Sequence, residues 1–273
     1  MLRIGRIDYA NVTPLFYGLT ACFSCDGYRI VPGVPAVLNK MLAAGEIDVC
    51  PSSSFAYAVN AERYLILPEL SISSAGPVAS VLLFSQVPIE KLDGRTVLLS
   101  AESATSVNLL KILMNKRFGC RCTFRVSSSG IAAALKEAPA MLLIGDAALR
   151  SSLAGSAPYI YDLGSLWHDW TGLPFVFALW FCTRTAAAEH RQEMTVLAGQ
   201  LLKAKEYARR ERERIAAQAN EASWMGRERL IAYWRDNISY DLGQEELDGL
   251  RLFYSYAAEL GLLSAEPELV LFS

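Results

Sequence analysis

Short apolar runs alternate with amphipathic segments through the first two-thirds of the chain. Runs of about four to eight apolar or β-branched residues are typical of buried strands. We expect strands over 2–7, 28–31, 47–50, 64–67, 78–85, 96–99, 123–126, 141–144 and 175–182. Helix-like segments follow most of them, with Pro14 and Pro35 in two first turns. Right-handed crossovers between such units predict a mostly parallel sheet.

Helical spacing dominates after the last of these runs. Helices are expected over 186–219, 222–236 and 244–261. The pattern therefore predicts an α/β protein of two lobes: 1–85 with 176–273 as lobe 1, and 86–175 as lobe 2. The helical C-terminal segment is expected to pack on lobe 1. Two chain crossings between lobes make a hinge that suits closure around a ligand.

Small polar residues gather where predicted strands give way to helices. The four corners are Asn11-Val-Thr13, Ser52-Ser53-Ser54, Ser103-Ala-Thr105-Ser106 and Gly145-Asp146. Helix capping explains any single corner. Ligands of open α/β sheets bind beyond the carboxyl ends of strands, and helix N-termini attract anions. Four corners on two lobes thus indicate a shared cleft for a small anion, with Ser80 either on its edge or facing inward.

Charge and composition narrow the class of function. The formal net charge is -2 with a pI near 5.8, so no basic field favours nucleic acid or an anionic membrane. The alternating signs of Arg209 to Arg214 indicate a solvated helix face. No apolar run reaches the roughly 18 residues that cross a bilayer, and the first residues do not read as a secretory signal. We expect a cytoplasmic protein with a small-molecule partner.

Cysteines and histidines do not form a recognisable site. Cys22 and Cys25, like Cys120 and Cys122, lack a matching pair that would complete a zinc set, and neither His168 nor His190 supplies one. We expect free thiols without a role. Phosphate-loop, dinucleotide, zinc-protease and serine-hydrolase motifs are missing from the sequence. The chemistry is therefore expected to need no metal, cofactor or obvious nucleophile.

Five stretches in this order resemble the chorismate dehydratase family. They are RIGRIDYANVTPL at 3–15, GPVASV at 76–81, SATSV at 103–107, LIGDAAL at 143–149 and WHDWTGLPFVFA at 167–178. The likeness extends over nearly the whole chain. It implies the two-lobed fold of type 2 periplasmic binding proteins in a cytoplasmic lyase. That enzyme would convert chorismate to 3-[(1-carboxyvinyl)oxy]benzoate and water on the futalosine route to menaquinone.

The resemblance also implies roles for single residues. Asn11 and Ser80 match catalytic positions. The substrate pocket would be completed by Ser52, Ser53, Ser103, Thr105, Ser106, Gly145 and Asp146. The proton acceptor stays open between Asp146 and the substrate's own enolpyruvyl carboxylate.

Two other functions remain as alternatives. One is a non-catalytic protein that binds a carboxylate metabolite. The other is the related dihydroxynaphthoate-forming enzyme, which depends on a histidine in the cleft. The sequence is compatible with a monomer or a homodimer.

Overall fold

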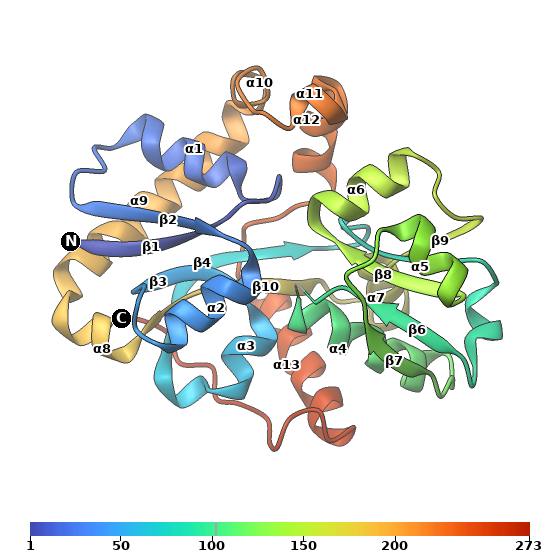
Figure 1. Ribbon diagram of the computed structural model, residues 1–273. Helices are drawn as coiled ribbons and strands as arrows, with labels where there is room; N and C mark the ends of the chain where they lie inside the picture. The colour runs from blue at the N-terminus through green and yellow to red at the C-terminus, as the bar shows by residue number, and fades with distance from the viewer. Residues whose placement is uncertain (102) are drawn as a thin grey trace.

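Two mixed sheets form the framework of the computed structural model, which describes residues 1–101 and 103–273 (Figure 1). The first sheet has the order β2-β1-β3-β10-β4 and the second the order β7-β6-β8-β5-β9. The first comprises β1 (Leu2–Ile7), β2 (Tyr28–Gly33), β3 (Val49–Ser53), β4 (Tyr64–Ser74) and β10 (Phe175–Thr183). The second comprises β5 (Val81–Ser85), β6 (Thr96–Leu99), β7 (Thr123–Val126), β8 (Ala140–Ile144) and β9 (Tyr159–Asp162).

Helices cover both sheets. The N-terminal part holds α1 (Thr13–Cys22), α2 (Pro35–Ala43) and α3 (Ser54–Val59), and the middle of the chain holds α4 (Ala104–Ile112), α5 (Ile131–Glu137), α6 (Gly145–Leu153) and α7 (Leu163–Thr171). The C-terminal helices are α8 (Arg184–Glu189), α9 (Arg191–Arg210), α10 (Arg212–Ala216), α11 (Ala222–Met225), α12 (Arg227–Asp236) and α13 (Gln244–Glu259). None of the helices in the described part of the chain is long and apolar enough to span a membrane.

The expectation of a mostly parallel sheet is wrong for two strands. β10 runs antiparallel to both β3 and β4, and β5 runs antiparallel to both β8 and β9. Each of these strands enters its sheet from the other sheet, so the right-handed crossover that makes neighbours parallel does not constrain it. The remaining pairs, β1 with β2 and β3, and β6 with β7 and β8, are parallel as expected.

The chain passes from the first sheet to the second between β4 and β5. The sequence assigns residues 78–85 to lobe 1, yet β5 hydrogen-bonds within the second sheet. The passage therefore occupies residues 75–80, which include Ser80. The return lies between the end of β9 and the start of β10. This path places Ser80 at the junction of the two sheets.

The C-terminal helices pack mainly against the first sheet and its helices. α9 lies along α1 and contacts β4, while α13 contacts β10 and also α4. Gly18 allows the close approach of α1 to α9, because a Cβ at this position would lie 2.6 Å from the carbonyl oxygen of Ala204. The helix expected over 186–219 is instead three helices, interrupted at His190 and Glu211, whose backbone angles leave the helical region.

All six cysteines are free, in agreement with the sequence analysis. Cys50, Cys120 and Cys182 are buried, and burial raises the pKa of each of these thiols. A raised pKa keeps a thiol neutral and unreactive. These three side chains therefore serve as small apolar groups in the core.

An ion pair ties β1 to the start of β3. The backbone N–H and Nε of Arg3 both donate to Oδ2 of Asp48, at 2.7 and 3.1 Å. Burial of Asp48 favours its neutral form, but the donors of Arg3 outweigh it and hold the pKa of Asp48 below its usual range. A carboxyl with a lowered folded-state pKa stabilises the fold above its unfolded pKa of about 4, and loses this contribution as the pH falls through the folded value.

We expect Asp48→Asn to lower the free energy of unfolding by about 1–3 kcal/mol at pH 7, because it weakens charge-assisted hydrogen bonds. Urea unfolding at pH 7 and below pH 4 measures this effect. The free energy of unfolding of the wild type should fall more between the two pH values than that of Asp48→Asn. The exposed Asp26→Asn is a matched control and should behave like the wild type. An equal fall in the wild type and in Asp48→Asn would contradict the assignment.

Candidate active site

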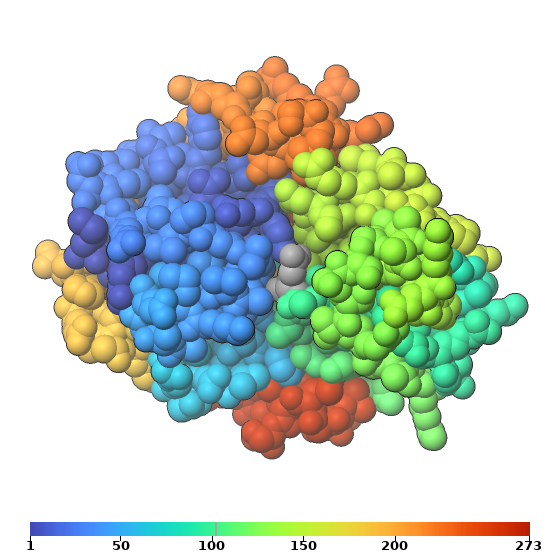
Figure 2. Space-filling model, viewed as in Figure 1, coloured from blue at the N-terminus to red at the C-terminus, as the bar shows by residue number. Residues whose placement is uncertain are grey.

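A cavity lies between the two sheets and opens to the surface. Its volume is about 540 Å³, including space open to solvent. Figure 2 views the groove between the N-terminal residues, in blue, and residues of the second sheet, in green. The lining residues are Ile7, Tyr9, Asn11, Pro35, Ser53, Ile72, Val78, Ser80, Val81, Ser103, Ser106, Ile144, Gly145, Phe177 and Ala178. A mostly apolar wall with a few polar groups is typical of a small-molecule site.

The structure brings together one or more residues from each predicted corner. Asn11, Ser53, Ser80, Ser103, Ser106 and Gly145 all line the cavity. Ser52, Thr105 and Asp146 are absent from its wall and make other contacts, described below. The expected convergence of the corners is therefore present, although three of the nine residues singled out do not line the cavity.

Asn11 lines the cavity and carries a side-chain oxygen without a hydrogen-bond partner among the described residues. This atom, Oδ1, is buried. The capping role considered for Asn11 or Thr13 is wrong, since Val12 occupies the N-cap of α1 without a side-chain bond and Thr13 Oγ1 donates to Glu221. A buried polar group without a partner costs free energy unless a bound molecule pairs with it. The position of Asn11 thus suits contact with a ligand.

Side chains from the C-terminal segment hold the backbone of the Asn11 loop. Trp234 Nε1 donates to the carbonyl oxygen of Ala10 at 2.8 Å, and the Tyr240 hydroxyl donates to that of Asn11 at 2.7 Å. Both aromatic side chains are buried. The Asn11 side chain is therefore carried by a loop whose backbone is fixed from behind.

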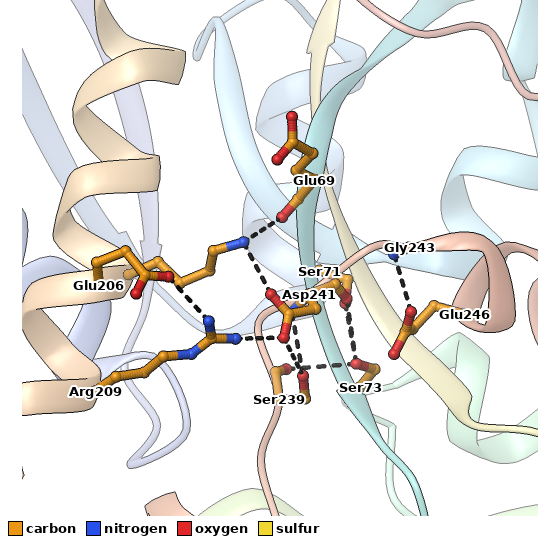
Figure 3. A network of polar contacts seen from close by, with 10 residues as sticks. Glu69, Ser71, Ser73, Glu206, Arg209, Ser239, Asp241, Gly243 and Glu246 are labelled. Carbon is orange, nitrogen blue, oxygen red and sulfur yellow. Dashed lines mark hydrogen bonds and ion pairs between the residues drawn. The ribbon is translucent and has the colours of Figure 1, made fainter.

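A polar network centred on Asp241 fixes the segment that carries Tyr240 (Figure 3). The buried Lys205 of α9 donates to Asp241 Oδ1 at 3.0 Å and to the carbonyl oxygen of Glu69 at 2.8 Å. Arg209 also pairs with Asp241, and Ser71 of β4 donates to its carbonyl oxygen. Although burial opposes ionisation, Lys205 and Arg209 lower the pKa of Asp241. The carboxylate therefore stays charged and joins α9, β4 and the segment before α13.

Ser80 ends a strained turn that a carboxylate holds in place. Ala79 has a φ of 58°, in the left-handed region that non-glycine residues rarely adopt. Asp162 accepts the N–H of Val78 at 3.1 Å and that of Ala79 at 2.6 Å. The same carboxylate caps α7 by accepting the N–H of Ser165. Burial raises the pKa of Asp162 in spite of these donors. The turn is thus fixed before the chain enters β5.

The Ser80 hydroxyl lies between the cavity and α12. Its side chain is only 2% exposed. The Tyr233 hydroxyl donates to Ser80 Oγ at 2.9 Å, while Ser80 itself donates to the carbonyl oxygen of Val78 at 3.3 Å. The second of these bonds is long for a hydroxyl donor. Ser80 therefore combines a firm hydrogen bond from Tyr233 with a weak one to Val78.

Thr105 forms a seam between α4 and the end of β3. Its Oγ1 lies 2.7 Å from Ser53 Oγ, accepts the N–H of Phe55 at 3.1 Å and lies 3.3 Å from Ser54 Oγ. Thr105 is fully buried. It thus holds the two sheets together at one edge of the cavity instead of facing a ligand.

Helix capping, considered for each corner, is confirmed for two serines. Ser53 Oγ accepts the N–H of Ala56 at the start of α3, and Ser103 Oγ accepts that of Ser106 at the start of α4. Both residues also line the cavity. Ser52 plays a structural part, since its hydroxyl donates to Asn39 of α2. Capping and cavity lining are therefore compatible at the same serine.

Asp146 connects the second sheet to the loop after β1. Its Oδ1 accepts the N–H of Ala10 at 3.0 Å. Burial raises the pKa of Asp146, the charge of Glu221 adds to this effect, and the N–H of Ala10 opposes it. Gly145 beside it has a φ of 58°, and a Cβ there would lie 2.9 Å from the ring of Tyr9. Glycine is required at this close approach between the two halves of the cavity.

The cavity would hold an anion with neutral donors. Its described lining residues include no lysine, arginine, histidine, aspartate or glutamate. Serine hydroxyls and the Asn11 amide are the candidate donors at its wall. The N–H of Gly145 at the start of α6 already donates to the carbonyl oxygen of Ser80 at 2.8 Å, and that of Ser106 in α4 donates to Ser103 Oγ, so a ligand would have to use other N–H groups of these first turns. Residues 1–101 and 103–273 contain no group of three or more histidine, cysteine or acidic side chains placed to bind a metal ion.

Sequence reasoning missed several residues of this site. Tyr9 and Phe177 line the cavity, and Tyr233, Trp234 and Tyr240 support it from behind. Tyr9 could have been found by its place two residues before Asn11. The other side chains carry no local signal, because they reach the site through the return of distant segments.

Known proteins resemble this chain in sequence along most of its length. A family model described as menaquinone biosynthesis matches residues 2–259. A chorismate dehydratase from Thermus thermophilus is 34% identical, over 95% of this chain and 95% of that protein. A chorismate dehydratase from Campylobacter jejuni is 33% identical over 67% of this chain and 68% of that protein.

Solved structures show the same fold at lower identity. A crystal structure of a protein from Archaeoglobus fulgidus has a TM-score of 0.76 and 20% identity, covering 96% of this chain and 98% of that one. The periplasmic aliphatic sulphonate binding protein of Escherichia coli has a TM-score of 0.67 and 17% identity, covering 98% and 90%. The fold is thus that of periplasmic binding proteins, as the sequence led us to expect.

Proposed function

Since the chain belongs to the menaquinone biosynthesis family, we propose that it is a chorismate dehydratase, a lyase that forms 3-[(1-carboxyvinyl)oxy]benzoate and water. The observation that carries this proposal is the cavity in which Asn11, Ser80 and the starts of α4 and α6 converge without a charged side chain among the described lining residues. Such a site suits a small dianion that is to be oriented and dehydrated.

The reaction is an elimination of water that needs no oxidant or reductant. Chorismate loses the hydrogen at C3 as a proton, and the electrons of that C–H bond form the new C3–C4 π bond. The C4–O bond breaks with its electron pair on oxygen, which takes up one proton and leaves as water. The product ring is aromatic, which supplies the driving force without a cofactor. Negative charge that develops at C3 spreads through the diene onto the ring carboxylate. N–H donors at a helix start would stabilise this charge by about 3–4 kcal/mol per well-placed donor.

Asn11 and Ser80 are proposed to act on the ring and on the leaving oxygen. The Ser80 hydroxyl would donate to the departing 4-hydroxyl, exchanging its weak bond to Val78 for a bond to substrate. The buried Asn11 amide would pair with the substrate and orient the ring. Ser53, Ser103, Ser106 and Gly145 would complete the binding surface.

The substrate's enolpyruvyl carboxylate is the proposed proton acceptor. Asp146 lies outside the cavity wall, and one of its oxygens is engaged by Ala10. The described lining residues offer neither a carboxylate nor an imidazole. A folded-back enolpyruvyl group would take the C3 proton and return it to the departing hydroxyl, so protons and charge balance within the bound molecule.

Asp146→Asn tests this assignment while preserving an oxygen for the bond to Ala10. We expect kcat to stay within about threefold of the wild type, whereas loss of a true general base would lower it by about 10²–10⁴-fold. Steady-state kinetics with chorismate measure the effect. Glu102→Gln, which lies outside the described residues, is assayed beside it. A collapse of kcat with intact chorismate binding in either variant would disprove substrate-assisted deprotonation.

Mass spectrometry of purified protein mixed with chorismate tests the function itself. We expect a product lighter by one water, with the absorbance of a substituted benzoate, and no product from heat-denatured protein. Unchanged chorismate that nevertheless binds in calorimetry would identify a binding protein. Unchanged chorismate without binding would overturn the proposed substrate.

The lobes are proposed to follow the two sheets. In this assignment lobe 1 contains β1–β4, β10 and the C-terminal helices, and lobe 2 contains β5–β9, so β5 moves to lobe 2. The enzyme is proposed to act in the cytoplasm on a free small molecule. Its assembly is left as monomer or homodimer.

A further inference from the structure

A tyrosine outside the cavity wall is bonded to one of the two proposed catalytic residues. Tyr233 lies in α12, and its hydroxyl donates to Ser80 Oγ at 2.9 Å. Tyr233 is 4% exposed and Ser80 is 2% exposed. This hydrogen bond is therefore shielded from water, and in the protein interior it is stronger than it would be at the surface.

The phenol remains a donor across the working pH range. Burial raises the pKa of Tyr233 far above that of a free tyrosine, and the charges of Asp146 and Asp162 act in the same direction. The hydrogen bond to Ser80 acts in the opposite direction, favouring ionisation, but does not outweigh burial. Tyr233 is thus neutral and keeps its proton for Ser80.

The direction of this bond determines what Ser80 is able to do. A serine hydroxyl has one proton and two acceptor lone pairs. Because the phenol occupies a lone pair, the Ser80 proton must point elsewhere, and its current acceptor is the carbonyl oxygen of Val78 at 3.3 Å. A hydroxyl that accepts one hydrogen bond becomes a better donor in the next.

We propose that Tyr233 is a positioning residue that acts through Ser80, turning the Ser80 proton toward the substrate oxygen that leaves and strengthening it as a donor. This inference rests on the proposed function. It adds a residue from the C-terminal third of the chain to the machinery of the cavity.

Two neighbouring contacts support this reading of α12. Trp234, the next residue, donates to Ala10 beside Asn11, and Asn237 Nδ2 donates to the carbonyl oxygen of Pro77 in the Ser80 turn. One short segment thus holds the backbone near both proposed catalytic residues. Of these three residues, Tyr233 alone donates to a side-chain atom of Asn11 or Ser80, so its effect is separable from general support of the backbone.

Tyr233→Phe removes the donor and keeps the ring. We expect kcat for chorismate to fall roughly tenfold, the kinetic equivalent of one hydrogen bond, while KM stays within about twofold. Tyr57→Phe is the matched control, because Tyr57 is also buried and donates to the carbonyl oxygen of Glu268, away from the cavity. This control should match the wild type in kcat, and thermal melts of both variants report folding.

A double-mutant cycle distinguishes positioning from support. In a Ser80→Ala background the Tyr233→Phe change should have no further effect on kcat, because Tyr233 acts through the missing hydroxyl. Equal losses in the two backgrounds, or an unchanged kcat in Tyr233→Phe, would overturn the inference.

A second substitution covers the case in which Tyr233→Phe does not fold. Fluorotyrosine at position 233 keeps the ring and the hydrogen bond but makes the phenol a stronger donor. We therefore expect kcat to rise or to stay unchanged. Fluorotyrosine at position 57 is the control and should leave kcat unchanged. A fall in kcat would contradict the inference. If the wild type does not convert chorismate, both the proposed function and this inference fail. If the wild type converts chorismate and Tyr233→Phe has the same kcat, the inference alone fails.

Discussion

Asn11→Ala is expected to lower kcat for chorismate dehydration by about 10²–10³-fold, the usual cost of losing one hydrogen-bonding group aimed at a reacting centre. The same change should leave the protein as stable as the wild type or more stable. Asn11 Oδ1 is buried without a partner among the described residues, so its removal takes away a desolvated polar atom and breaks no bond made by that oxygen. Activity should therefore fall without a loss of stability.

Steady-state assays and thermal melts of the same preparation measure both quantities. Asn60→Ala, at the C-terminal end of α3 and outside the cavity lining, is a suitable control for handling and folding. A variant that loses stability in parallel with activity would show that Asn11 is a structural residue. Retention of the wild-type kcat would remove Asn11 from the proposed mechanism.

Asp241→Ala is expected to lower the free energy of unfolding by about 3–5 kcal/mol, because it leaves the buried Lys205 ammonium without its carboxylate. The loss should extend to activity, since Asp241 fixes the segment whose Tyr240 holds the Asn11 loop. Urea unfolding followed by fluorescence measures the change. Glu206→Ala, which removes an exposed partner of Arg209, should cost less than about 1 kcal/mol.

A double replacement tests the cause of this loss. Lys205→Met together with Asp241→Asn removes both charges, so much of the stability lost in Asp241→Ala should return. If the double variant is as unstable as Asp241→Ala, the loss comes from the hydrogen bonds of the Asp241 segment and not from an uncompensated buried charge.

Local sequence patterns predict where the strands and helices of this protein lie better than they predict which strands pair and in which direction. The alternation of apolar runs and amphipathic segments gives most of the strands and the corners where polar residues gather. The orientation of β5 and β10 was not predictable in this way, because each strand joins a sheet whose other members lie far along the chain. The periodicity of a strand is the same whichever sheet receives it.

Prediction of the site had the same limit. Asn11 follows from corner chemistry and from the resemblance, whereas Ser80 belongs to none of the four corners and received its catalytic role from the resemblance alone. Thr105 sits in an equally polar corner but faces the seam, because the rotation of α4 decides which side of a helix start meets the cavity. Tyr233 reaches Ser80 across 153 positions of sequence, and no pattern near either residue reports that contact.

The Thr105 seam has a consequence for how molecules enter and leave. Proteins of this fold that carry solutes take up and release their cargo by swinging two lobes apart about a hinge. Here a wide swing would strip a fully buried hydroxyl from three partners at once and expose them to solvent. We therefore expect substrate and product to enter and leave through small local openings of the cavity, without full separation of the two sheets.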